Sequence, residues 1–242
     1  MPVLCYHSIC DAWNSPLAVT ESAFQEQCDK LSQRFDVRSL DAAVESMNRH
    51  GRLPRRTIAI TFDDGFVDNI EVALPIVRRH NLPIAVFVVA ATIDRTFEVN
   101  WVDTPPPFRL ETLTRDHLEE MVREGVTIGS HSLFHKDLTS LSFEECLEDL
   151  TSSKAVLEEA IRGPVRYLAY PRGLWNDTVA RAARLAGYAN AFALPISPEK
   201  AGPFSLPRVG IYRNNGPIRF KLKTSSWYQT ARTSHIYQAI RG

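Results

Sequence analysis

The sequence predicts an α/β fold organised around a parallel barrel. Short apolar segments alternate with amphipathic helical patterns along most of the chain, and polar residues with chemical capability directly follow several of the apolar segments. This arrangement is typical of parallel α/β barrels, whose functional sites form at the carboxyl ends of the strands. A length of 242 residues fits one such domain. A doubly wound open sheet is the structural alternative.

The expected strands and helices follow from two different periodicities. Strands are predicted where short, mostly apolar runs occur, namely at 3–6, 57–62, 84–90, 127–129, 167–170, near 191 and at 209–211. Helices are predicted where apolar residues recur every three or four positions, namely at 21–34, 40–50, 70–80, 116–124, 142–161 and 177–186. Ser142 with Glu145 gives the fifth helix a capping-box start, and Gly187 ends the sixth.

Residues 92–115 break the alternation of strands and helices. The segment contains three consecutive prolines at 105–107 and the aromatic residues Phe97, Trp101 and Phe108. It is too short for a domain, so we expect a loop insertion. Trp101 suggests a wall on which a sugar ring stacks, and ordinary packing is the alternative.

Two adjacent acids, Asp63 and Asp64, follow the apolar run Thr57–Phe62. A run of this kind belongs to a strand that is covered on both faces, where two neighbouring carboxylates cost several kcal/mol unless a metal or a proton compensates them. We therefore expect an active site here. A tight turn through Asp-Asp-Gly is the alternative, although a turn needs only one acid.

Two histidines, His131 and His135, follow another short apolar segment at Thr127–Gly129. Imidazoles four residues apart can converge on one ion if the backbone turns helically between them. One carboxylate and two imidazoles make three protein ligands and leave coordination positions for water and substrate, which is the layout of a catalytic metal site.

These segments resemble a known family. Thr61-Phe62-Asp63-Asp64-Gly65 and His131-Ser132-Leu133-Phe134-His135 are similar to the first two motifs of the polysaccharide deacetylases, also called the NodB-homology or carbohydrate esterase family 4 domain. Three further segments resemble the branch that includes the poly-N-acetylglucosamine deacetylases, namely Leu4–Ile9, Tyr170–Gly173 with Leu185–Tyr188, and Leu206–Arg208. The resemblance covers about residues 2 to 212. It implies an irregular, incomplete (β/α) barrel at 1–212, and leaves 213–242 as a basic C-terminal tail packed on the domain or extending from it.

The resemblance also implies a reaction, the hydrolysis of acetamide groups on N-acetylated sugars in a polysaccharide or oligosaccharide. Asp64, His131 and His135 would hold one divalent ion, zinc by expectation, with cobalt or nickel as alternatives. Asp63 would be the catalytic base that takes a proton from water.

The remaining roles are less direct, because the chain departs from the usual family pattern. It has no late Leu-x-His motif, and its late strand reads Leu206-Pro207-Arg208. The branch with the opening Tyr-His strand is circularly shifted, so His7 is expected to be the general acid, with a structural histidine as the alternative. Ala169 occupies the usual position of an orienting arginine, and Arg208 is expected to compensate. The Arg172 backbone N–H is expected to help bind the oxyanion, and Tyr170 to shape the pocket.

Two other functions stay open on the same fold. One is hydrolysis of another C–N amide, as in allantoinase-like and imidase-like members, some of which lack the ion. The other is non-catalytic glycan binding. A glycosidase with two carboxylates is disfavoured, because adjacent residues cannot supply the roughly 5 Å or wider separation across a sugar that such enzymes use.

The composition limits partners and location. With 28 basic and 28 acidic residues the chain has no global field to attract nucleic acid. It has no apolar run long enough to cross a bilayer and no signal peptide as written, which predicts a cytoplasmic protein, or an extracytoplasmic one if the N-terminus was trimmed. The basic tail suggests peripheral contact with a membrane or a partner, and a solvated helix is the alternative. The four cysteines lack C-x-x-C spacing and are expected to be free buried thiols.

Overall fold

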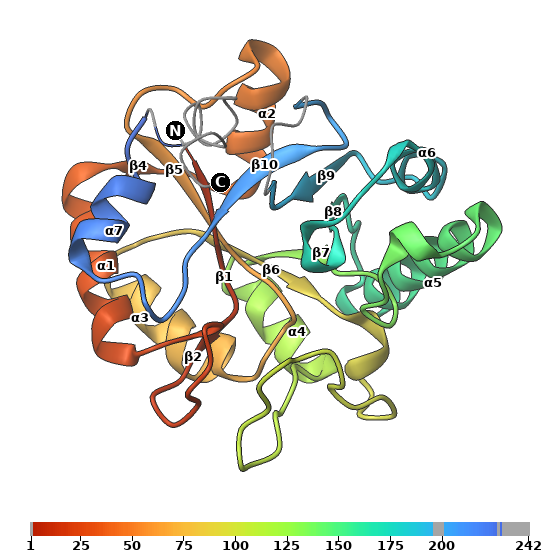
Figure 1. The fold of residues 1–242 in the computed structure, drawn as a ribbon, viewed down its shortest axis with the longest axis horizontal. Helices are drawn as coiled ribbons and strands as arrows, with labels where there is room; N and C mark the ends of the chain where they lie inside the picture. Colours follow the sequence, from red (N-terminus) through yellow and green to blue (C-terminus); the bar gives the residue numbers. More distant parts are fainter. Residues whose placement is uncertain (1, 196–200, 227, 229–242) are drawn as a thin grey trace, which may run out of the picture.

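A parallel barrel of seven strands forms the centre of the computed structural model, which describes residues 2–195, 201–226 and 228 (Figure 1). The barrel strands are β1 (Val3–Tyr6), β5 (Thr57–Phe62), β6 (Ile84–Val88), β7 (Thr127–Ser130), β8 (Tyr167–Ala169), β9 (Asn190–Ala193) and β10 (Leu206–Gly210). Their hydrogen-bonded order is β1-β10-β9-β8-β7-β6-β5, and parallel pairing of β1 with β5 closes the ring. A complete barrel of this class has eight strands, and β7 and β8 share a single register pair. The predicted irregular, incomplete barrel is therefore confirmed.

Helices surround the barrel, and short strands flank it (Figure 1). The helices are α1 (Glu21–Arg34), α2 (Leu40–His50), α3 (Leu74–Arg79), α4 (Arg115–Arg123), α5 (Phe143–Ile161), α6 (Asp177–Leu185) and α7 (Pro217–Lys223). The additional strands are β2 (Ser8–Ile9), β3 (Ala18–Val19) and β4 (Asp36–Val37). Ser142 and Glu145 form the expected capping box at the start of α5. None of the helices in the described part of the chain has the length and apolar character that a membrane span requires.

Strand alternation divides the apolar residues of the barrel strands between two clusters. In β5, Ile58, Ile60 and Phe62 pack outward against the helices as part of the large cluster. The intervening Ala59 belongs to a smaller cluster inside the barrel. That interior cluster also holds the Phe87 and Phe192 rings, and α2 contributes Leu40, Ala43 and Val44 to it. Inward-facing positions nearer the carboxyl ends of the strands are therefore available for polar residues.

Gly129 makes room for one of these interior rings. A Cβ atom at this position would overlap Phe87 Cδ1, and the Phe87 ring packs against Phe192. We expect Gly129→Ala to lower the free energy of unfolding by about 1–3 kcal/mol, the usual cost of overpacking a core. Chemical denaturation measures the change. Gly163→Ala is the matched control, because its Cβ would meet no atom closer than 3.7 Å, and an equal loss in both variants would contradict this explanation.

Several predicted elements differ from the observed ones at their ends. The helix expected at 70–80 begins as a π-helical turn, Asn69–Ala73, before α3. The strand expected at 84–90 ends at Val88, and the one expected at 209–211 spans Leu206–Gly210 with Pro207 inside it. Backbone hydrogen bonding, which side-chain periodicity does not report, sets each of these boundaries.

The beginning of the C-terminal tail packs on the barrel domain. Helix α7 buries Phe220, which joins the large cluster, while Ile218 is 85% exposed. The rest of the predicted tail, residues 227 and 229–242, lies outside the described residues.

Candidate metal centre and catalytic site

Asp63 and Asp64 are buried at the carboxyl end of β5. Asp63 continues the inward alternation of the strand, and Asp64 adopts a left-handed conformation, with φ of 72°. Gly65, with φ of 69°, continues the turn. The turn and the active-site interpretations of this motif are therefore compatible. The two acids lie in a tight turn, and both are buried, with exposed fractions of 1% for Asp63 and 2% for Asp64.

Three side chains converge as the expected metal ligands. Asp64 Oδ1 lies 3.6 Å from His131 Nε2 and 3.4 Å from His135 Nε2. Bonds of about 2.1 Å at tetrahedral angles place neighbouring zinc ligands about 3.4 Å apart. The donor set and its spacing therefore fit a divalent ion.

The electrostatics of these side chains also suit a cation. Burial and the neighbouring Asp63 charge raise the pKa of Asp64 to about 8. Burial and the proximity of His131 lower the pKa of His135 to about 2, so its imidazole is neutral and able to bind a metal.

The two histidines are presented by a loop rather than by the helical turn that their spacing suggested. Ser132 and His135 have positive φ angles of 67° and 56°, so the two imidazoles converge although the backbone between them is not helical. Side chains hold the loop instead: the His135 N–H donates to Ser132 Oγ, and the Leu133 N–H donates to Asp149 Oδ1 on α5. These hydrogen bonds, one within the loop and one to α5, stabilise the left-handed residues, which would otherwise be strained.

Arg208 reaches Asp63 from inside the barrel. Its Nη1 and Nη2 donate to the two Asp63 oxygens over 2.6 and 2.7 Å, and both side chains are almost fully buried. Burial by itself would raise the pKa of Asp63, but the Arg208 guanidinium outweighs it and holds this pKa well below its usual range. The guanidinium also lies over the Phe87 ring, 5.2 Å from its centroid. Arg208 thus lies where it can orient Asp63, as expected of a residue that replaces the missing arginine at position 169.

His7 follows β1 and lies beside Asp63. One of its ring nitrogens, an Asp63 oxygen and Cys5 Sγ all lie within 4.8 Å of one another. Burial lowers the pKa of His7 to about 4, so the imidazole is neutral at pH 7. Its Nδ1 is buried without a hydrogen-bond partner among the described residues, while its backbone carbonyl accepts from the Asn69 side chain.

Tyr170 and Arg172 occupy different surroundings. Tyr170 is buried in the large cluster and its hydroxyl donates to the Phe204 carbonyl, so this side chain lies in the core and not with the ligand groups. Arg172 has a left-handed φ of 57° and a half-exposed side chain, whose Nη2 donates to the Trp101 carbonyl.

Sequence reasoning missed two contacts in this site. The Cys5 thiol was expected only to be buried and free, which the structure confirms, but it also donates to Asp63 Oδ2 over 3.3 Å. Trp101 reaches the candidate metal ligands, and its indole N–H donates to Asp64 Oδ1 over 3.1 Å. Because Trp101 is only 9% exposed and stacks on His135, the packing alternative describes it better than the sugar wall. Inward alternation in β1 was a usable signal for Cys5, whereas nothing local pointed to the Trp101 contact.

Comparison with known proteins agrees with the motifs. The family model for polysaccharide deacetylase matches residues 50–191, a range that holds the acid pair and both histidines but neither His7 nor Arg208. YxkH of Bacillus subtilis is 24% identical over 189 residues, which are 78% of this chain and 62% of that protein. A poly-beta-1,6-N-acetyl-D-glucosamine N-deacetylase of Staphylococcus aureus is 25% identical over 210 residues, 79% of this chain and 67% of that protein. The chain thus spans only 62% to 67% of the length of these relatives.

Solved structures share the fold. The Streptococcus pyogenes deacetylase PplD superposes with a TM-score of 0.79 at 23% identity, covering 93% of this chain and 98% of that one. IcaB from Ammonifex degensii gives a TM-score of 0.74 at 24% identity, covering 94% and 96%. At these identities the structures support the fold alone. The family match extends over more than half of the sequence, and the chain belongs to the polysaccharide deacetylase family.

Proposed function

We propose that this protein is a metal-dependent N-deacetylase that removes acetyl groups from N-acetylated sugars in a polysaccharide or oligosaccharide. The observation that carries the proposal is the convergence of Asp64, His131 and His135 next to an Asp63 that Arg208 keeps ionised. The substrate class is supported by family membership and by the Staphylococcus aureus relative, whose name specifies an N-acetylglucosamine polymer.

The reaction exchanges one bond for another at the acetyl carbon. Water forms a new C–O bond, the C–N bond breaks, and the products are acetate and a sugar amine. A divalent ion held by Asp64, His131 and His135 would polarise the acetyl carbonyl and lower the pKa of the attacking water. Zinc is the proposed ion, with cobalt and nickel as alternatives, because imidazole and carboxylate ligands suit all three.

Asp63 is the proposed base. Its carboxylate must be ionised at neutral pH in order to accept a proton from water, and the two hydrogen bonds from Arg208 favour that state. Arg208 therefore acts as a positioning residue. It fixes the carboxylate plane and supplies the charge that the buried acid needs.

His7 is the proposed acid for the departing amine. Since its imidazole is neutral before the reaction, it has to gain a proton during turnover. An Asp63 carboxylate oxygen lies within 4.8 Å of a His7 ring nitrogen, so the proton that Asp63 accepts from water is close to His7. The Arg172 backbone N–H is proposed to stabilise the negative charge that develops on the carbonyl oxygen, with no role assigned to the Tyr170 side chain.

Two alternatives differ in what they require of the site. Hydrolysis of a cyclic amide, as in allantoinase-like relatives, uses the same fold with another substrate. Glycan binding without catalysis would not need the acid pair or the ligand histidines, and all four residues are buried in a converging arrangement. A catalytic function is therefore preferred to glycan binding, and the name of the Staphylococcus aureus relative favours an acetamide substrate over a cyclic amide.

Acetate release discriminates among these functions. Purified protein loaded with zinc, cobalt or nickel is incubated with chito-oligosaccharides, with a poly-N-acetylglucosamine exopolysaccharide, and with allantoin and a cyclic imide. We expect release of acetate from at least one N-acetylated glycan and no turnover of the cyclic amides. Turnover of a cyclic amide alone would favour the imidase-like alternative, and absence of all turnover with every metal would contradict an enzymatic function.

A further inference from the structure

The insertion after β6 reaches into the metal centre through one side chain, Trp101. The segment leaves the barrel at Ala90–Thr92 and returns at α4, and it lies at the carboxyl end of the barrel (Figure 1). Two backbone hydrogen bonds fasten it next to the acid pair, from Val67 N–H to the Glu111 carbonyl and from Leu113 N–H to the Gly65 carbonyl. The insertion and the turn that carries Asp64 are therefore one connected structure.

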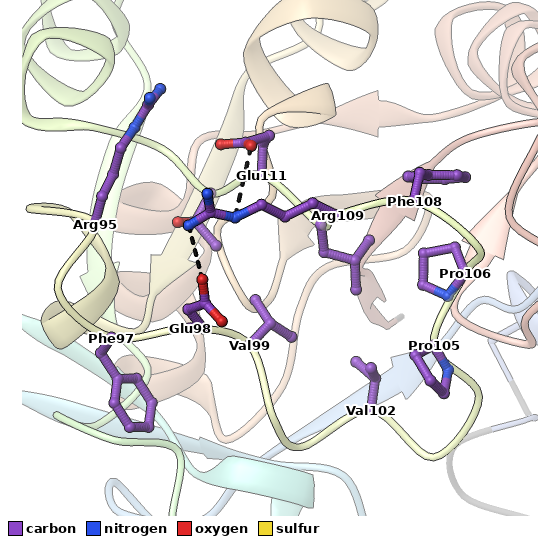
Figure 2. Close-up of a pocket in the computed structure, with 12 residues that line it drawn as sticks. Arg95, Phe97, Glu98, Val99, Val102, Pro105, Pro106, Phe108, Arg109 and Glu111 are labelled. Atoms are coloured by element: carbon purple, nitrogen blue, oxygen red, sulfur yellow. Dashed lines mark ion pairs between the residues drawn. The ribbon is translucent and has the colours of Figure 1, made fainter.

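The insertion is also folded on itself. Figure 2 shows Arg109 paired with Glu98 and Glu111 across a pocket whose sides include Phe97, Val99 and the prolines Pro105 and Pro106. The exposed ion pairs stabilise the loop little. Buried contacts hold it more firmly: the Trp13 indole donates to the Thr104 carbonyl over 2.7 Å, and Val99, Val102 and Leu110 pack on the cluster of Trp13 and Phe66. Trp101 is thus presented from an ordered loop.

Trp101 contacts two of the three metal ligands. Its Nε1 donates to Asp64 Oδ1 over 3.1 Å, and this is the same oxygen that faces both histidines. Its ring stacks on the His135 ring, with centroids 4.6 Å apart and planes 18° apart. Arg172 donates to the Trp101 carbonyl, which fixes the backbone at this position.

The two ligand histidines differ in how they are oriented. His131 Nδ1 lies 2.8 Å from the Ala169 carbonyl, the usual arrangement that fixes the ring and leaves Nε2 free for a metal. His135 Nδ1 is buried without a hydrogen-bond partner among the described residues. The stacked indole therefore fixes the plane of the His135 ring, as the hydrogen bond to the Ala169 carbonyl fixes the ring of His131.

We propose that Trp101 is a positioning residue of the metal centre, which orients Asp64 through its indole N–H and His135 through its ring face. This inference rests on the proposed function in that it takes the three donors as a metal site. Partners that orient metal ligands contribute about 10–100-fold to metal affinity. The insertion would then supply part of the metal affinity as well as covering the site.

Two substitutions of Trp101 separate its hydrogen bond to Asp64 from its stacking on His135. Trp101→Phe retains a ring that can stack and removes the N–H, and Trp101→Ala removes both. Phe108→Ala is the matched control, because Phe108 belongs to the same insertion and is 43% exposed, on the side of the pocket opposite Phe97 in Figure 2. Zinc affinity is measured on the folded, metal-stripped proteins by competition with a chromophoric chelator, and the visible absorption of the cobalt-loaded forms reports ligand geometry.

We expect the Kd for zinc of Trp101→Ala to be about 10–100-fold above that of the unaltered protein. The Kd of Trp101→Phe should lie between these two values. The cobalt spectrum should change in both variants and stay unchanged in Phe108→Ala. A Kd within about twofold of the unaltered protein in both Trp101 variants, or an equal loss in Phe108→Ala, would overturn the proposal. If the unaltered protein bound no zinc, cobalt or nickel, the proposed function itself would fail; normal metal binding and acetate release with insensitive Trp101 variants would refute this inference alone.

Discussion

Replacement of Asp63 by Asn is expected to reduce acetate release by about 10²–10⁴-fold, the usual contribution of a general base. An amide of the same shape cannot accept a proton from water, so the loss follows from chemistry rather than from a change in volume. Asp63 does not belong to the three converging donors, in which Asp64 is the carboxylate. Zinc content should therefore remain close to one ion per chain.

Asp64→Asn provides the matched control for this prediction. It changes the neighbouring acid in the same way but alters a ligand, so it should lower zinc affinity as well as turnover. Both variants are assayed for acetate and for bound metal after their folding has been checked by circular dichroism. Loss of the metal from Asp63→Asn, with retention in Asp64→Asn, would mean that the two acids have the opposite roles.

Replacement of Arg208 by Met is expected to destabilise the protein by about 3–5 kcal/mol, because it leaves the buried Asp63 carboxylate without its counter-charge. Arg208 is 0% exposed and forms two hydrogen bonds to that carboxylate. Chemical denaturation measures the effect. Turnover should fall as well, since the base loses both its orientation and the charge that keeps it ionised.

Two control variants test whether the loss of stability comes from the unpaired buried charge. Replacing both partners in Asp63→Leu/Arg208→Met removes the unpaired charge, so the double variant should be more stable than Arg208→Met alone. Arg49→Met breaks the exposed pair of Arg49 with Glu45 and should change stability by less than about 1 kcal/mol. A double variant no more stable than Arg208→Met would show that the pair is not what stabilises this part of the barrel.

Local patterns in the sequence were sufficient for an α/β fold and for the candidate ligands, and the resemblance to the deacetylase family added the irregular barrel. Apolar runs located the strands, three-to-four periodicity located the helices, and the residues following two strand ends proved to be the converging donors Asp64, His131 and His135. Alternation within a strand also explains why Arg208 points inward, toward Asp63.

Contacts between distant segments were beyond local reasoning. The position of β1 between β10 and β5, which brings His7 beside Asp63, depends on barrel closure. The turn between the two histidines depends on Asp149, which lies on a different element. Trp101 sits in a proline-rich loop without periodicity, and its contact with Asp64 arises only from the way in which the loop folds back.

The most direct test of the central claim is a metal titration of acetate release. Protein stripped of metal with a chelator is reconstituted with increasing zinc, and acetate release from an N-acetylated glycan is measured alongside bound zinc. We predict no release without metal and a rise that saturates at one zinc per chain, with no comparable rise in His131→Ala. Full release from the stripped protein, or saturation without dependence on His131, would contradict the assignment of Asp64, His131 and His135 as the site of a catalytic ion.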